Sequence, residues 1–207
     1  MLTSKCRFSN AAPIEQRRTQ IIEAAVEVFL ESGFDRASMT RIAKHSGVSK
    51  QTLYSHFGSK ENLFREAINE ACRQHTPTAL IDAQKLSPRD ALMKIGGELC
   101  SLLFSEDAIR LETLCVAGAS KHPEVSEIFW QAGPVWIRAR LSEFFSSLID
   151  KGQLKQTDAN LIARQFISLL CGEHRVKALM GIARVETHEQ EKIVADATDL
   201  IIAAYST

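Results

Sequence analysis

The sequence predicts an all-α fold of about nine helices. Helix formers such as Ala, Leu, Glu, Lys and Arg occur throughout the 207 residues, and only five residues are Pro. No stretch alternates β-branched and polar residues as a half-buried strand would. Capping Ser residues, Gly and Pro divide the chain into segments of helical length. We therefore expect no sheet, a small N-terminal three-helix domain and a larger helical domain after it.

The first helix is expected from about Ile14 to Glu31, because apolar residues recur on one face and Gly33 with Phe34 forms a helix stop. Two short helices follow, one from Ser38 to Gly47 and one from Ser49 to Gly58. A fourth helix begins at Ser59 and extends toward Pro77. Ser87 caps a helix that ends near Phe104. The remaining helices are expected at about 106–119, 123–132, 134–150, 158–180 and 188–205.

The composition is that of an ordinary globular protein, with 45% hydrophobic and 24% charged residues. No apolar run reaches the roughly 18–20 residues of a membrane span, and the first residues lack the apolar stretch of a secretory signal. We expect no membrane partner and a cytoplasmic location. The five Cys residues are widely spaced, without a Cys-x-x-Cys pair, and indicate neither disulfides nor zinc. We interpret them as buried apolar residues, with a redox-sensing thiol as the alternative.

Charge is unevenly distributed along the chain, although the formal net charge is zero. Residues 1–75 contain 11 basic and 8 acidic residues, a net charge of +3, whereas residues 76–207 contain 14 and 17, a net charge of −3. Between residues 36 and 60 there is no acidic residue. The basic residues in this stretch are Arg36, Arg41, Lys44, Lys50 and Lys60. This local excess predicts a surface that faces phosphates.

Residues 38–57 are predicted to form a helix-turn-helix. Ile42 of the first short helix faces inward with Ala43, and Leu53 and Phe57 do so in the second, while Gly47 makes the tight turn. Two helices this short bury too little surface to stand alone, so they must pack on the helices that flank them. Taken alone, such a basic pair of helices is either a DNA-binding element or a solvated surface.

The outer face of the second short helix carries side chains that suit DNA. Gln51 can pair with the N6 and N7 edge of adenine, the Thr52 methyl can meet a thymine methyl, and Ser55 can bond to a base edge. The side chains that suit phosphates are Lys50, Tyr54 and His56. Lys60, at the positive N-terminus of the fourth helix, is expected to add a phosphate contact.

The stretch that begins at Phe34 resembles the DNA-binding domain of the TetR family of bacterial regulators. It has the sequence F-(x)3-S-M-T-R-I-A-K-H-S-G-V-S-K-Q-T-L-Y-S-H-F-G-S-K-E-N-L-F, and the resemblance covers about residues 15–65. The motifs that carry it are Gly33-Phe34, Ile42-Ala43, Gly47-Val48-Ser49, Thr52-Leu53-Tyr54, Phe57 and Ser59-Lys60-Glu61.

By this resemblance, the second short helix lies in the major groove of DNA. The expected DNA-binding residues are Ser38, Thr40, Arg41, Ser49, Lys50, Gln51, Thr52, Tyr54, Ser55, His56 and Lys60. Two positions depart from the common pattern. Gln51 replaces a small residue or Pro, and Arg41 stands where an acidic capping partner is frequent. Both departures add chemistry directed at DNA and leave the operator sequence open.

TetR-like proteins are similar in being homodimers, and two reading heads about one helical turn apart, ~34 Å, can read a palindrome. The last two predicted helices have wide apolar faces, which either cover their own core or, as the resemblance favours, form a four-helix bundle with a second subunit. The expected dimerisation residues are Ile162, Phe166, Leu169, Leu170, Ile193, Ala197, Leu200 and Ile201.

The middle of the chain combines aromatic residues with few charges, and these form either plain core or an apolar ligand cavity. The expected ligand-binding residues are Phe104, Cys115, Trp130, Trp136 and Phe166. The stretch from Leu111 to Gly172 resembles the AefR-like C-terminal subgroup, which suggests control of efflux or stress. We expect no cofactor and no metal, because no potential ligands recur at metal-binding spacing.

These patterns predict a sequence-specific DNA-binding transcription regulator with a DNA-binding domain at 12–58, and the resemblance to the TetR family implies a ligand-binding and dimerisation domain at 59–207. A small hydrophobic effector is expected to release this repressor from a palindromic operator. The alternatives are an architectural DNA binder without a ligand and a helical enzyme with an incidental helix-turn-helix. We expect no enzyme, because the phosphate-binding Gly loop, the Gly-x-Ser-x-Gly elbow and the His-Glu-x-x-His pair are all missing.

Overall fold

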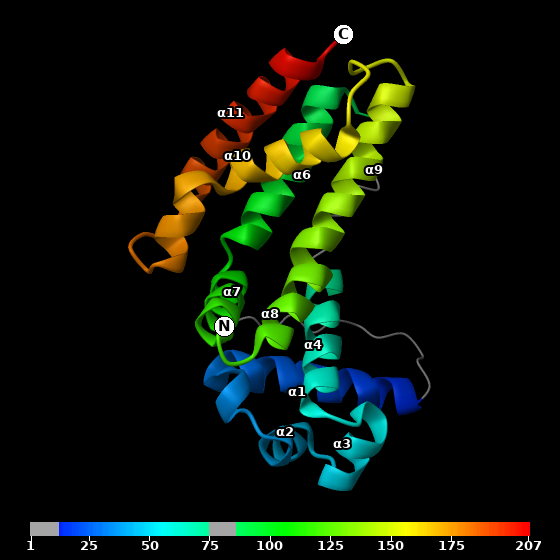
Figure 1. Ribbon diagram of the computed structural model, residues 1–207, viewed down its shortest axis with the longest axis vertical. Helices are drawn as coiled ribbons and strands as arrows, with labels where there is room; N and C mark the ends of the chain where they lie inside the picture. Colours follow the sequence, from blue (N-terminus) through cyan, green and yellow to red (C-terminus); the bar gives the residue numbers. More distant parts are fainter. Residues whose placement is uncertain (1–12, 75–85) are drawn as a thin grey trace. The chain divides into compact units, whose positions relative to one another are not determined.

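The computed structural model describes residues 13–74 and 86–207, and this part of the chain is helical, which confirms the predicted fold class (Figure 1). Nine continuous helices occur in these ranges, because two of the labelled α-helices join through a π-helical turn. The β-type pairing in the same ranges is an isolated bridge between Leu154 and Ser206. The chain divides into two compact units between Ala71 and Cys72.

The first unit is built from four helices. They are α1 (Pro13–Arg36), α2 (Met39–Ser46), α3 (Lys50–Phe57) and α4 (Lys60–Gln74). Three aromatic rings join α1 to α4, since the ring of Phe64 lies edge-on to Phe29 at 5.0 Å and to Phe34 at 5.4 Å. Because of this packing, the first compact unit includes part of α4, whereas we expected the domain boundary before this helix, after residue 58. The expected continuation of this helix toward Pro77 lies outside the described residues.

Helix ends in the first unit lie where the capping residues predict them. Gly33 has a φ of 76° and interrupts α1 at the expected stop, beyond which helical backbone continues to Arg36. Gly47, with a φ of 70°, ends α2 in the left-handed region that favours glycine. Ser38 and Ser49 accept hydrogen bonds from backbone N–H groups three residues later, at 3.1 Å and 3.0 Å.

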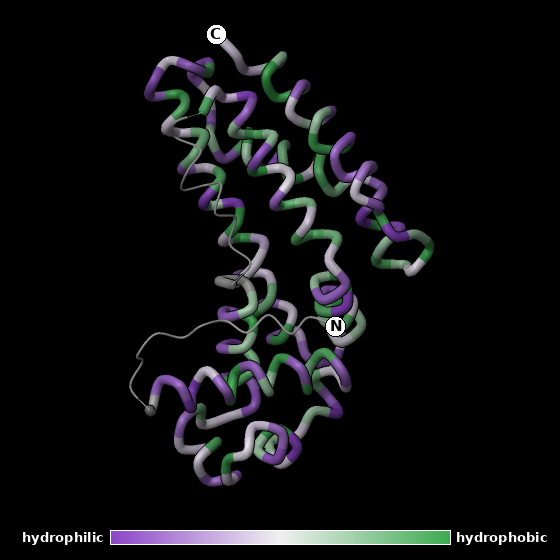
Figure 2. Tube along the Cα trace, turned by 180° about the vertical axis from the view of Figure 1, so that it is seen from behind, coloured by the Kyte–Doolittle hydropathy of each residue, from purple (hydrophilic) through white to green (hydrophobic). Residues whose placement is uncertain are grey.

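The described part of the second unit contains six α-helices. They are α6 (Pro88–Leu103), α7 (Glu106–Gly118), α8 (Pro123–Trp130), α9 (Trp136–Asp150), α10 (Ala159–Leu179) and α11 (Thr187–Tyr205). Of these, α6, α9, α10 and α11 form the apolar core of the unit. α10 packs on α9 and α11 packs on α6, with Phe145 and Phe166 fully buried among aliphatic side chains. Apolar and polar residues alternate along these helices (Figure 2). In the described ranges, no helix has the length and apolar character of a membrane span.

Two features of this unit correct the predicted helix boundaries. We expected separate helices on either side of Gly133-Pro134, but a π-helical turn, Gln131–Val135, carries α8 into α9. The turn absorbs Pro134, which has no N–H and would clash in a regular α-helix. We also expected an unbroken helix over 158–180, but Gly172 leaves the helical conformation, with φ 43° and ψ −151°. A residue without Cβ permits this break.

Candidate nucleic-acid interface

The inner side of α3 fixes which of its residues face solvent. Leu53 is 0% exposed and Phe57 is 6% exposed, so both anchor α3 in the core of the first unit as predicted. The side chains on the outer and flanking sides remain exposed and are here called the exposed face of α3; they are Lys50, Gln51, Tyr54, Ser55 and His56. Five of the predicted DNA-binding residues are thus brought together on one surface.

Hydroxyl groups near the start of α3 bond to the helix itself. The Oγ of Ser49 accepts from the Thr52 N–H and lies 2.8 Å from the Thr52 Oγ1. Ser55 Oγ donates to the Thr52 carbonyl at 2.8 Å. Thr52 is half-buried, whereas Gln51 beside it is exposed. The long amide of Gln51 is therefore the best placed of these groups to reach a base edge.

Lys50 and Tyr54 lie one turn apart on the exposed face of α3. The ammonium of Lys50 is 5.9 Å from the centre of the Tyr54 ring, a cation–π distance. Tyr54 is 44% exposed, so its hydroxyl can be reached from solvent. A cation and a phenol hydroxyl on one surface can both donate hydrogen bonds to phosphate oxygens.

Two side-chain contacts join α2 to α1. Arg41 Nη2 donates to Glu31 at 2.6 Å, and His45 Nε2 lies 2.6 Å from the carboxylate of Glu27. Both carboxylates are one helical turn apart on α1, and both basic side chains are one turn apart on α2. Arg41, predicted to contact DNA, is thus engaged in positioning α2, while Ser38 and Thr40 are exposed in its first turn. The matching i,i+4 spacing was the signal that sequence reasoning missed.

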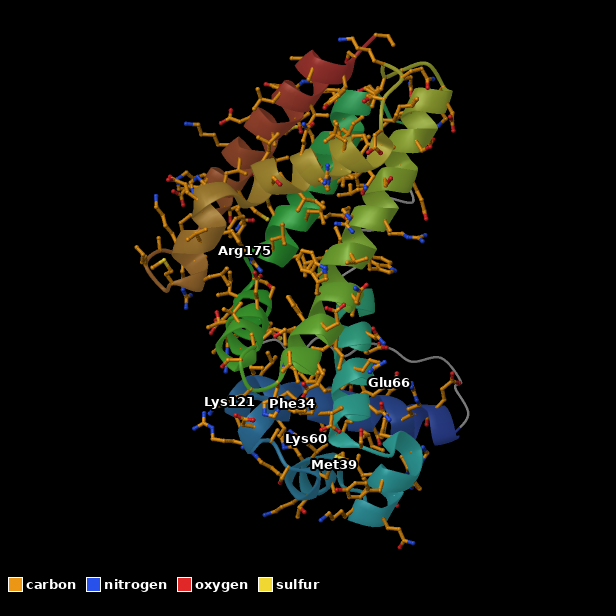
Figure 3. All side chains as sticks on the ribbon, in the orientation of Figure 1. Phe34, Met39, Lys60, Glu66, Lys121 and Arg175 are labelled. Carbon is orange, nitrogen blue, oxygen red and sulfur yellow. The ribbon has the colours of Figure 1, made fainter. Side chains whose placement is uncertain are left out.

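Lys60 has a role within the fold that its sequence position did not indicate. Its ammonium donates to the carbonyls of Phe34 and Ala37 at 2.9 Å and 3.3 Å, and lies 4.2 Å from the centre of the Phe34 ring (Figure 3). These carbonyls follow the interruption of α1 at Gly33. Lys60 therefore joins α4 to the end of α1, and a phosphate contact by this residue remains a prediction.

The predicted ligand-binding residues differ in burial. Phe166 belongs to the core of the second unit, and Phe104 packs against that same core. Cys115 is buried in α7, whereas Trp136 is half-buried and Trp130 is 50% exposed. A ligand site formed by these residues stays a prediction.

The predicted dimerisation residues divide between core and surface. Five of them lie in the core of their own chain, which leaves them no surface for a partner: Ile162, Phe166, Leu170, Ala197 and Ile201. The apolar faces of α10 and α11 are wide enough to cover the core and still leave Leu169 38% and Leu200 57% exposed. Ile193 is half-buried. An open groove of about 640 Å³, lined from both helices, contains Leu169 and Leu200.

Sequence reasoning also missed a polar pair in the second unit, Arg175 of α10 and Glu112 of α7, which are hydrogen-bonded. Within the ranges that the structure describes, no three His, Cys, Asp or Glu side chains form a potential metal site.

Two family models match the chain in consecutive segments. The model of the tetR family of bacterial regulatory proteins matches residues 21–67, which contain α2 and α3. The model of the C-terminal domain of AefR-like transcriptional repressors matches residues 90–207, more than half of the chain.

Curated relatives are similar mainly around the helix-turn-helix. The chain is 47% identical over 58 residues to the HTH-type transcriptional activator FasR of Mycolicibacterium smegmatis, which is 28% of this chain and 26% of FasR. It is 30% identical over 95 residues to the fatty acid metabolism regulator protein of Bacillus subtilis, which is 45% of this chain and 49% of that protein. The matched segments thus span about a quarter to a half of these relatives.

Solved structures resemble the whole fold. A protein from Mesorhizobium loti assigned to the TetR-family transcriptional regulators superposes with a TM-score of 0.86 at 25% identity, covering 95% of this chain and all of that chain. The flavonoid-responsive regulator FrrA has a TM-score of 0.76 at 26% identity, covering 93% and 98%. FadR of Bacillus subtilis, solved with stearoyl-CoA, has a TM-score of 0.68 at 21% identity, covering 89% and 97%, and shares the fold.

Proposed function

Because the chain belongs to the TetR family of bacterial transcriptional regulators, we propose that it is a repressor that leaves a palindromic operator when a small hydrophobic effector binds. The observation that supports this most directly is the exposed face of α3. It gathers an amide, a cation, a phenol and an imidazole on a short helix that the rest of the unit holds rigidly. An operator-binding protein works where the chromosome is, which agrees with the cytoplasmic location expected from the sequence.

In this proposal α3 enters the major groove and Gln51 reads a base pair there. Lys50 and Tyr54 bind the flanking phosphates, which fix the register of the helix. The contacts of Arg41 and His45 with α1 help to position α2, on which α3 packs. Sequence preference therefore depends chiefly on Gln51, while affinity depends on the charged and phenolic contacts.

Dimerisation in this proposal uses the outer surface of α10 and α11. The exposed Leu169 and Leu200 line the groove between these helices, and burying such apolar side chains against a second copy is favourable. Two subunits then present two copies of α3 to a palindrome. Of the five core residues of these helices, Ile201 also lines this groove, whereas the other four support the interface from behind.

The effector is proposed to bind in the C-terminal unit and to favour the conformation with low operator affinity. Linkage requires that DNA weakens effector binding by the same factor by which the effector weakens DNA binding. The relatives are named for fatty acid metabolism and for flavonoid response, and both fatty acids and flavonoids are largely hydrophobic. The shared property, not either compound, is what we extend to this chain.

DNA binding is tested by gel-shift titration on fragments flanking the gene that encodes the protein. Gln51→Ala should relax the preference at one base pair, where a good bidentate contact contributes about 1–3 kcal/mol. Tyr54→Ala should weaken binding equally on all fragments. Gln153→Ala, which removes the same amide from an exposed position of the C-terminal unit, serves as the matched control and should bind as the wild type does.

Undiminished binding by both α3 variants would reject this interface. The logarithm of the association constant should also fall steeply with the logarithm of salt concentration, because phosphate contacts release counterions. A screen of hydrophobic compounds for release of DNA then separates a ligand-responsive repressor from an architectural DNA binder, which no compound would release.

A further inference from the structure

A buried ion pair joins α7 to α10 in the C-terminal unit. Arg175 is 7% exposed, and its Nη2 donates to Oε2 of Glu112. The other polar residues that are buried in the described ranges, Ser32 and Thr198, are uncharged. Arg175 follows the break of α10 at Gly172, and Figure 3 labels it where α10 faces α6 and α7. A charge in this position needs full hydrogen bonding to be tolerated.

One nitrogen of the guanidinium lacks that bonding. The Nη1 of Arg175 is buried and has no hydrogen-bond partner. Native proteins satisfy nearly all buried donors, because an unsatisfied donor loses its bonds to water without replacement. Glu112 is 27% exposed in its side chain and already receives the other nitrogen. An acceptor that enters from outside would complete the bonding of Arg175.

The helix that carries Glu112 leaves much of its apolar surface incompletely packed. Along α7 only Cys115 is fully buried, whereas Ile109, Leu111 and Leu114 are half-buried. Phe104, at the end of α6, is half-buried as well. Burial, and to a smaller extent the charge of Glu112, raises the pKa of the Cys115 thiol to about 12, which agrees with the burial of this side chain in α7. Apolar side chains with a single convergent polar group are typical of small-molecule sites.

We propose that Arg175 binds an uncharged acceptor oxygen of the hydrophobic effector, such as that of a ketone, an ester or a phenol. Glu112 neutralises the guanidinium, so a carboxylate would add a second negative charge where hydration is poor. A neutral oxygen accepts from Nη1 and leaves the Arg175–Glu112 bond in place. This inference rests on the proposed ligand response and specifies the chemical class of the ligand.

The test uses the full chain and matched probes in calorimetric titrations. The neutral probes are 2-undecanone, methyl decanoate and 4-phenylphenol; decanoate and 4-phenylbenzoate are the acids, and biphenyl is the hydrocarbon. The wild type should prefer neutral oxygen-bearing probes over acids and biphenyl. Arg175→Met, which keeps an unbranched side chain without donors, should weaken the neutral probes about tenfold or more, as expected for a lost hydrogen bond to a charged donor.

Two further variants make the result specific. Lys177→Met removes an exposed cation of the same helix, one that pairs with Glu173, and should bind every probe as the wild type does. Glu112→Gln removes the neutralising charge, so the preference should shift toward the acids, which a merely structural role of Arg175 would not produce. This shift decides the question even if Arg175→Met does not fold.

The inference is overturned if Arg175→Met binds the neutral probes as tightly as the wild type, if the wild type prefers acids or biphenyl, or if no neutral probe binds. The proposed function has its own readout, the release of DNA by compounds from an unbiased screen. A protein that acids or hydrocarbons release from DNA would keep the proposed function and reject the role given to Arg175.

Discussion

Lys60 shows how one side chain can take part in both stability and binding. Its ammonium donates to the carbonyls of Phe34 and Ala37, and an ammonium has three N–H groups. At most one therefore remains for a phosphate. A substitution of Lys60 would weaken the first unit and any phosphate contact together. Tests at Gln51 and Tyr54, whose side chains project from an exposed face, report on DNA alone.

The thiols of Cys100 and Cys115 should resist alkylation in the native protein. Burial raises the pKa of each from 9.0 to about 12, so about one thiol in 10⁴ is a thiolate at pH 8. We expect iodoacetamide, followed by mass spectrometry, to label both at least about a hundredfold more slowly in the native than in the denatured chain. The burial of these two thiols agrees with their interpretation as apolar core residues. Cys171 is half-buried, and the side chains of Cys6 and Cys72 lie outside the described part of the chain.

The same shifts predict how stability depends on pH. Because the folded-state pKa lies above the value of the unfolded chain, these thiols contribute stability that is fully present below about pH 9 and is lost as pH rises toward 12. Fast labelling of either residue under native conditions would show that it is accessible as a thiolate and would contradict this account.

Among the helices, α2 and α3 depend most on their neighbours. Each has eight residues, which is too short for a helix that is stable in isolation. Serine caps, left-handed glycines and the side-chain contacts with α1 define where these helices begin, end and attach. The orientation of α3 is therefore a property of the four-helix unit.

Neighbouring glycines in α6 should respond oppositely to alanine. A Cβ at Gly96 would lie 2.8 Å from Val194 Cγ1 and 3.2 Å from Phe166 Cζ, and such overpacking costs about 1–3 kcal/mol. A Cβ at Gly97 would have no atom within 4 Å, and alanine there should stabilise the helix by about 0.5–1 kcal/mol. Denaturant unfolding of both variants measures the difference. Equal stability of the two would show that α6 and α11 can move apart without cost.

Across the whole chain, the two compact units differ in the sign of their net charge. The N-terminal part has a net positive charge and the remainder a net negative charge, which favours approach to DNA through the first unit. In the proposed function one copy of α3 reaches only a few base pairs, and a second subunit supplies the remaining affinity for a palindrome.

Leu200→Glu should therefore weaken both dimerisation and operator binding. The residue is 57% exposed and lines the groove between α10 and α11, where a carboxylate buried against a partner would be strongly unfavourable. Analytical ultracentrifugation at micromolar concentration should show a wild-type dimer and a variant monomer. Val116→Glu, at a 67% exposed position of α7, is the control. A monomeric wild type, or a variant that stays dimeric, would place the interface elsewhere.

Much of the fold could be predicted from local sequence. Ser38, Gly47 and Ser49 bound their helices because a cap acts on groups at most a few residues away. Leu53 and Phe57 could be assigned to the inner side of α3 because helical spacing puts them on one face. The same spacing leaves Gln51 on the outer side and Tyr54 on a flanking side, so the candidate reading surface was also predictable.

Contacts between distant segments could be identified only in the folded chain. Helical periodicity shows that α10 and α11 each have an apolar face, but not which residues of a wide face meet their own core; thus Ile162 is buried and Leu169 is exposed. The partners of Lys60 and Arg175 lie 26 and 63 residues away. A side chain's chemistry is contained in its own residue, whereas its burial and its hydrogen-bond partners depend on which segments the packing of the core brings beside it.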